Sequence, residues 1–174
     1  PNAGREPERG GGERMRIIGP ETYRLTFDEQ RFAVICSENK SRFSGIAASA
    51  IPKLYVVTMT GRPVYVGQTT QRMQQRFQAG WTGRWPYKWV RQGSEACVDI
   101  WGHVDSADKS ALDIETIEAE VVFLIRQAGQ WPLFQNEIHF HPSTEIHRAV
   151  AAEIFNRYEA ALSGTRTVTT ASPK

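Results

Sequence analysis

Two tyrosines and a glycine open the part of the chain where chemistry is expected. Tyr55 and Tyr65 stand ten residues apart in two strand-like segments, and Gly67 follows Tyr65 in the second. Glycine lets the backbone approach another group closely, and the helix expected next carries Arg72 and Arg76. A helix start attracts anions, and guanidinium groups bind phosphate in a bidentate way. Packing alone would also explain two strand tyrosines, but the whole set favours an anion site.

The cations are concentrated in one stretch, although the net charge of the chain is only +2. Residues 61–93 contain no Asp or Glu but six cations: Arg62, Arg72, Arg76, Arg84, Lys88 and Arg91. Aromatic residues among cations can stack on bases, although they can equally pin a loop onto the core; here they are Trp81, Trp85, Tyr87 and Trp89. The stretch predicts DNA contacts from Arg72, Arg84, Tyr87, Lys88 and Arg91.

A second cluster lies further along the chain. Glu137, His139 and His141 alternate, so one strand face could present them together, with His147 on the following helix. Such a set, joined by Glu118, is one hypothesis for a zinc site. Histidines at the surface or beside a nucleic-acid groove are the alternative, and we favour it because the pattern lacks a third firmly placed ligand.

The order of these residues resembles the core of the GIY-YIG nuclease superfamily. The resemblance rests on Leu54-Tyr55-Val56, Tyr65-Val66-Gly67, Arg76 on the next helix and Glu118 on a later one. It covers about residues 53–136, roughly half of the chain. It implies an endonuclease that hydrolyses DNA to 3′-hydroxyl and 5′-phosphate ends, with one Mg²⁺ or Mn²⁺ ion in each active site.

The resemblance also implies a role for each residue. Arg76 would hold the scissile phosphate and stabilise the transition state, and Glu118 would bind the metal. Tyr55 or Tyr65 would orient the attacking water or take its proton. A free tyrosine has a pKa of about 10, so a tyrosine base would need help from Arg76 or the metal. Which tyrosine acts is left open.

The metal-binding glutamate must be chosen from three on one helix. Glu118 and Glu120 flank opposite edges of the apolar stripe, so periodicity does not separate them. The family's local pattern, a Glu followed by Ala and an apolar stretch, favours Glu118 and leaves Glu120 in reserve. We interpret Glu115 as a solvated helix charge.

Two positions depart from the family pattern. A His or Tyr commonly follows the Arg by one helical turn, but Gly80 stands there; Trp81 or Tyr87 could take its place. An Asn often follows the Glu, and we assign Asn136 to this role as a DNA contact. The interval to Asn136 is long because residues 127–134 (QAGQWPLF) look like an insertion.

The elements that must position these residues indicate an α/β (α+β) fold with a small central antiparallel three-stranded sheet and flanking helices. We expect strands at 53–59, 63–67 and 96–104. We expect helices from residue 69 or 70 to about 79, at 107–128 and at about 143–162, with a break at 80–86. Residues 136–140 are expected to be extended, and residues 17–51 mix short strand and helix.

Length and composition indicate one folded body. The chain has 174 residues, 40% of them hydrophobic and 23% charged, which is typical of a single globular domain. We expect one nuclease domain over residues 15–162, between disordered tails at 1–14 and 163–174. No apolar run approaches the roughly 20 residues that span a membrane, and no secretory signal is evident. Cys36 and Cys97 are expected as reduced, buried thiols, so a cytoplasmic protein without a membrane partner is predicted.

Three functional hypotheses follow. The first is the DNA endonuclease, whose sequence specificity and role in restriction, repair, mobile elements or toxin systems are open, as is a homodimer. The second is a non-catalytic nucleic-acid-binding module that keeps the hairpin, a reading that Gly80 favours. The third is a zinc-dependent hydrolase that uses His139 and His141.

Overall fold

The computed structural model describes residues 15–36, 41–83, 87–105, 110–135 and 137–163. The elements in chain order are β1 (Ile17–Phe27), β2 (Phe32–Cys36), α1 (Gly45–Ala48), β3 (Lys53–Met59), β4 (Arg62–Thr69), α2 (Met73–Thr82), the 3₁₀ helix η1 (Lys88–Gln92), β5 (Glu95–His103), α3 (Ser110–Gln127) and α4 (Glu145–Ser163). The predicted tails lie outside the described residues, apart from Ser163, which ends α4. Asn136 and Arg84 also lie outside them.

The strands form one antiparallel sheet of five strands in the order β2-β1-β5-β3-β4. The mixed α and β class and the three expected strands are confirmed, but a three-stranded sheet is wrong. The two further strands come from the segment that the sequence left mixed. β1 pairs with β5 over most of its length, so the polar residues of β1 are stabilised by a partner far along the chain.

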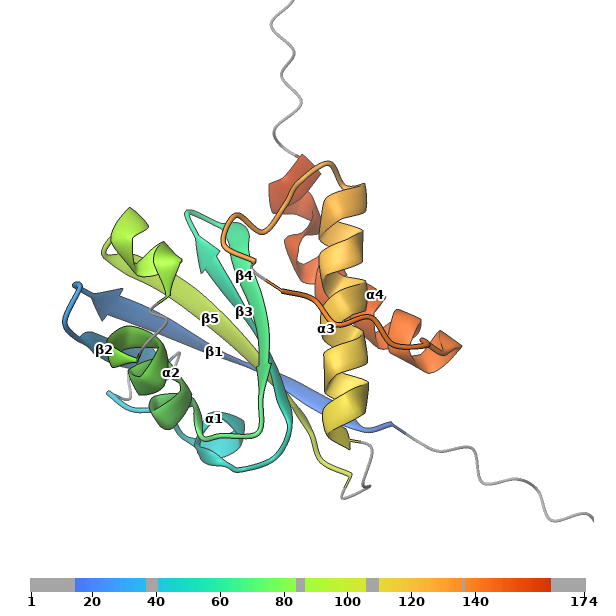
Figure 1. Cartoon of the computed structure of the whole chain (residues 1–174), viewed down its shortest axis with the longest axis horizontal. Coiled ribbons are helices and arrows are strands. Elements are labelled where there is room, and N and C mark those ends of the chain that lie inside the picture. Colours follow the sequence, from blue (N-terminus) through green and yellow to red (C-terminus); the bar gives the residue numbers. More distant parts are fainter. Residues whose placement is uncertain (1–14, 37–40, 84–86, 106–109, 136, 164–174) are drawn as a thin grey trace, which may run out of the picture.

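Helices cover both faces of this sheet (Figure 1). α1 and α2 lie on one face, over a core that includes Tyr23, Tyr55, Val57 and Phe77. α3 and α4 pack on the other face, over a core formed by side chains such as Leu54, Val56, Val66 and Trp101. The alternation predicted for β3 is therefore confirmed: neighbouring residues enter opposite cores.

The helix after the hairpin differs from the prediction at both ends. It begins after Arg72 rather than at a threonine cap, because Thr69 Oγ1 accepts a hydrogen bond from the backbone N–H of Gln71 in a local turn. It runs through Gly80 to Thr82, with Gly83 as its C-cap, so it ends slightly later than predicted but within the expected break at 80–86. Residues 137–140 form no strand; they belong to the irregular connection between α3 and α4.

The structure bears on two further expectations, the absence of a membrane-spanning segment and the burial of the cysteines. Among the described residues, no helix is both long enough and apolar enough to cross a membrane. Cys97 is a free thiol but is exposed, so its predicted burial is wrong. In β5, Glu95 and Cys97 are exposed, whereas Ala96 between them and every residue from Val98 to His103 are buried.

Candidate active site

The tyrosine hairpin is organised around Gly67. Tyr55 pairs with Gly67 across β3 and β4, whereas Tyr65 pairs with Val57. A Cβ at Gly67 would lie 2.6 Å from Tyr55 Oη and 2.6 Å from Tyr65 Cε1. The missing side chain therefore makes room for both rings, whose centroids are 5.9 Å apart. The close approach expected at Gly67 is made by the tyrosines, and Gly67 itself is buried beneath them.

Arg76 of α2 points into this hairpin. Its Nε donates a hydrogen bond to Tyr55 Oη at 3.2 Å, and its guanidinium carbon lies 5.9 Å from the centre of the Tyr87 ring. The interactions that raise its pKa all come from tyrosines. Among the described residues Arg76 has no carboxylate within ion-pair distance, so a half-buried positive charge faces the site without a neutralising partner.

Tyr87 occupies the space that Gly80 leaves open. A Cβ at Gly80 would overlap the Tyr87 ring, and Tyr87 Oη shares a hydrogen bond with Tyr55 Oη at 3.2 Å. Trp81, the other candidate for this place, instead donates from Nε1 to the Asp28 carbonyl oxygen. Helix α2 thus lacks a polar side chain one turn after Arg76, and a tyrosine from outside the helix supplies the hydroxyl there.

All three phenols of this cluster are neutral at ordinary pH. Burial raises the pKa of Tyr55 well above its usual value and also raises that of Tyr65. Burial raises the pKa of Tyr87 to about 12, although the Arg76 charge opposes the change. Neutral phenols donate and accept hydrogen bonds but resist losing a proton. Their natural role is therefore to orient a ligand or a water molecule.

Glu118 faces the same site from α3. Its carboxylate is buried (8% exposed) and lines a pocket of about 150 Å³ together with Tyr65, Gln68 and Arg76. Burial and the nearby Glu115 raise the pKa of Glu118 to about 8, against the lowering effects of Gln135, His139 and Arg76. Glu120 does not line this pocket, so the structure places the predicted first choice at the site and not the reserve.

Glu115 is not a solvated helix charge. Its two carboxylate oxygens lie 2.7 Å from His139 Nδ1 and 3.0 Å from His141 Nε2. His139 Nε2 lies 2.9 Å from a carboxylate oxygen of Glu137, and the two glutamates raise the pKa of His139. Sequence periodicity missed this role because the histidines come from the connection between α3 and α4, more than twenty residues away.

The side chains at the pocket can be compared with the ligands that Zn²⁺ and Mg²⁺ each require. Within the described parts of the chain, no group of three or more His, Cys, Asp or Glu side chains is placed to hold a metal ion. Zinc sites use such groups; of the residues in the zinc hypothesis, Glu118, Glu137 and His139 line the pocket and His141 does not. Mg²⁺ needs only one or two carboxylates, with water and phosphate oxygens completing the shell. The pocket-facing Glu118 fits that requirement.

Gln135 is a site residue that the sequence analysis missed. Its Oε1 accepts a hydrogen bond from the Val66 N–H at 3.0 Å, and its Nε2 donates to the Glu137 carbonyl oxygen at 3.2 Å. It also lies close enough to the Glu118 carboxyl to lower the pKa of that group. The apparent insertion is the signal that could have found it: this segment returns to β4, where the Phe134 N–H donates to the Val64 carbonyl oxygen.

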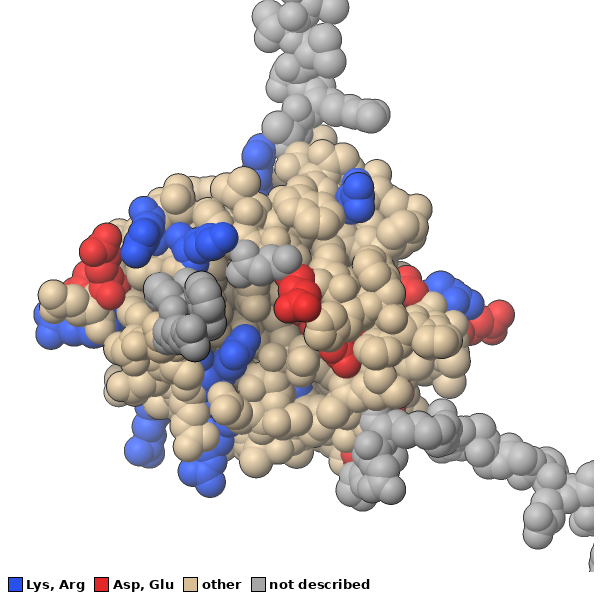
Figure 2. Space-filling model, in the orientation of Figure 1, with Lys and Arg blue, Asp and Glu red and all other residues tan. Residues whose placement is uncertain are grey.

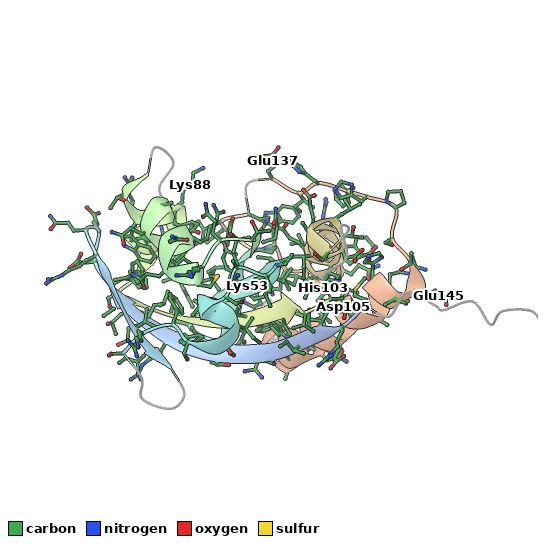
Figure 3. All side chains as sticks on the ribbon, turned by 90° about the horizontal axis from the view of Figure 1, so that it is seen from below. Lys53, Lys88, His103, Asp105, Glu137 and Glu145 are labelled. Atoms are coloured by element: carbon green, nitrogen blue, oxygen red, sulfur yellow. The ribbon has the colours of Figure 1, made fainter. Side chains whose placement is uncertain are left out.

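Exposed basic side chains lie on and near α2, the helix that carries Arg76. Arg72, Lys88 and Arg91 are exposed. Lys and Arg gather over the part of this face where α2 and η1 lie (Figure 2). Glu137 stands on the connection that runs past α3 (Figure 3). The pocket therefore has a basic side toward α2 and an acidic side toward α3, an arrangement that can hold a phosphate and a cation together.

Four residues predicted from separate segments meet here. Tyr65, Arg76 and Glu118 line one pocket, and Tyr55 contacts Arg76 directly. Comparisons of the chain with protein-family models, with curated proteins and with solved structures find no match. A functional assignment therefore depends on the chemistry of these residues and their positions.

Proposed function

We propose that this chain is a metal-dependent endonuclease of the GIY-YIG type that hydrolyses DNA phosphodiester bonds. The observation that carries the proposal is the meeting of Arg76, which has no carboxylate partner among the described residues, with the buried carboxyl of Glu118 in one pocket. A phosphodiester needs a cationic donor on its oxygens, and a hard cation needs a carboxylate. The pocket offers both groups next to three neutral phenols.

Arg76 is the proposed phosphate-binding residue. A guanidinium that is already half-buried and held by Tyr55 loses little freedom when it binds an anion. Its hydrogen bonds to the phosphate would strengthen as negative charge grows on the oxygens in the transition state. Among the described residues no carboxylate pairs with Arg76, which leaves its hydrogen-bonding groups available to a phosphate.

The tyrosines are proposed to orient the attacking water. A water oxygen forms the new bond to phosphorus, the bond to O3′ breaks, and a proton ends on the O3′ leaving group. Because their pKa values are raised, the phenols serve as hydrogen-bonding groups rather than as proton acceptors. Tyr65 is the better placed of the two for water contact, because it lines the pocket and is only partly buried.

Glu118 would hold one Mg²⁺ or Mn²⁺ ion, which when bound supplies positive charge beside the phosphate and leaving oxygens. Gln135 and the histidine–glutamate cluster hold Glu118 and its surroundings in place. The Tyr87 hydroxyl lies beside Gly80 and hydrogen-bonds with Tyr55, which supports the catalytic proposal over a non-catalytic module.

The test is cleavage of supercoiled plasmid DNA with Mg²⁺ and with EDTA. Wild type should cut only with the metal, and Glu118→Ala and Arg76→Ala should lose at least about 100-fold in rate. Glu120→Ala is the matched control on the same helix and should cut normally. DNA binding that survives EDTA, without cleavage in any metal, would instead establish a non-catalytic binding module.

A further inference from the structure

An aromatic groove of about 230 Å³ lies beside the candidate active site. Its walls come from α3, through Val122 and Phe123, and from the connection to α4, through Trp131, Ile138 and Phe140. Phe123, Trp131 and Phe140 are 48%, 46% and 75% exposed. Large apolar side chains gathered at the surface usually mark a binding surface.

The groove is continuous with the catalytic pocket. Glu137 lines both, and Gln135, which lines the groove, lies close enough to Glu118 of the pocket to lower its pKa. Ala119, which directly follows Glu118 in α3, also lines the groove. A group seated among the aromatic rings would therefore lie next to any phosphate held by Arg76.

The chemistry of the groove matches a nucleobase. Aromatic and guanidinium faces stack on bases, and the Arg126 guanidinium carbon lies 5.2 Å from the centre of the Trp131 ring. Besides Arg126, the polar side chains that line the groove are Gln135 and Glu137, and Glu137 also lines the pocket. Amide and carboxylate groups bind the hydrogen-bonding edge of a base. Stacked apolar walls with one polar end fit a planar heterocycle attached to a phosphate.

We infer that this groove binds an unpaired nucleobase next to the scissile phosphate, so that the preferred substrate is DNA with an unpaired nucleotide at the cleavage site. The inference rests on the proposed nuclease function, which it extends to a substrate class. A base inside a duplex is stacked and paired on both sides, and it must leave the helix before it can enter such a groove. Single-stranded DNA needs no such step.

The test compares a labelled single-stranded oligonucleotide with a blunt duplex of the same sequence, by fluorescence anisotropy with Ca²⁺ in place of Mg²⁺. Trp131→Ala should weaken single-strand binding about tenfold and change duplex binding less than about twofold. Phe123→Ala should act in the same direction. Leu133→Ala is the matched control, because Leu133 is exposed on the same connection but does not line the groove.

Two outcomes would overturn the inference: unchanged single-strand affinity in Trp131→Ala, or an equal loss for both DNAs. A wild-type dimer that Trp131→Ala dissociates in size-exclusion chromatography would also overturn it, since the groove would then bind a second copy. The nuclease proposal is judged separately by plasmid cleavage. If wild type cleaves plasmid DNA but Trp131→Ala binds single strands normally, only the proposed role of the groove is rejected. If Trp131→Ala weakens single-strand binding but wild type cleaves no DNA, only the proposed nuclease activity is rejected.

Discussion

Two arginine–tyrosine pairs lie on opposite faces of the sheet, and only one of them has a carboxylate partner. On the α4 side, Arg157 Nε donates to Asp99 Oδ2 at 2.8 Å, and Tyr158 Oη donates to the same oxygen at 2.7 Å. On the α2 side, Arg76 donates to Tyr55 Oη, and no carboxylate of the described residues pairs with it.

The difference separates a structural network from a binding site. In the first, the buried negative charge of Asp99 is matched inside the protein, so nothing remains for a ligand to neutralise. In the second, a half-buried cation and a buried carboxyl stand in one pocket without pairing to each other. Charges that are desolvated but unmatched cost stability and are retained where they act on a ligand.

Removing the two arginines one at a time gives the largest expected contrast. Arg76→Ala should lower the rate of plasmid cleavage at least about 100-fold, because it removes the phosphate donor. Arg157→Ala should leave the rate per folded molecule within about twofold. The measurement is initial cleavage rate with Mg²⁺, normalised to folded protein by circular dichroism. Equal losses in both variants would erase the distinction between the two faces.

Substituting the carboxylates Asp99 and Glu118 should give the opposite contrast in stability: the larger loss is expected on the α4 side, at Asp99. Asp99→Asn should lower the free energy of unfolding by about 2–4 kcal/mol, because it breaks a buried charged network. Glu118→Gln should not lower it near pH 7.5, because burial disfavours the charged form of Glu118 and glutamine carries no charge. Urea unfolding monitored by fluorescence measures both. A greater loss in Glu118→Gln would mean that Glu118 is a structural residue.

The raised pKa of Glu118 predicts how stability depends on pH in EDTA. The folded carboxyl holds its proton up to about pH 8, whereas the unfolded one loses it near 4.5. Wild type should therefore lose stability relative to Glu118→Gln as pH rises through this window, by about 2–5 kcal/mol in total. Urea midpoints of both proteins across the window measure the difference.

Adding Mg²⁺ to the same two proteins tests whether Glu118 binds the metal. At pH 8, millimolar Mg²⁺ should raise the melting temperature of wild type and leave Glu118→Gln unchanged, because the ion stabilises the ionised carboxylate of the folded state. Identical shifts in the two proteins would indicate that the metal binds elsewhere.

The exposed cations near α2 should show the smallest effects. Arg72→Ala, Lys88→Ala and Arg91→Ala should each weaken DNA binding a few-fold and lower the salt dependence by about one ion. Arg148→Ala, an exposed arginine of α4, is the control and should change neither quantity. Titrations at several salt concentrations measure both. If all three variants bind DNA as tightly as wild type, the DNA-binding surface does not include these residues near α2.

Local pattern was sufficient for most of the elements. β3 matches its predicted bounds, and β4, β5, α3 and α4 lie within a few residues of theirs, because alternation and helical periodicity are local properties. β1 and β2 were missed as a pair because β1 carries a polar, interrupted pattern, and its pairing with β5 supplies the stability that its sequence does not show. The start of α2 was predicted too early because Thr69, an expected helix cap, accepts its hydrogen bond within a local turn before the helix.

Residue type and chain order indicated Tyr55, Tyr65, Gly67, Arg76 and Glu118, because phosphate and metal chemistry requires such groups and they keep their order along the chain. Tertiary structure alone decided that Tyr87 fills the space above Gly80, that Glu115 holds two histidines, and that Gln135 joins the pocket to the aromatic groove. These contacts depend on how the connection after α3 returns to β4. The physical reason is that a sequence pattern records neighbours along the chain, whereas desolvation and charge pairing depend on neighbours in space.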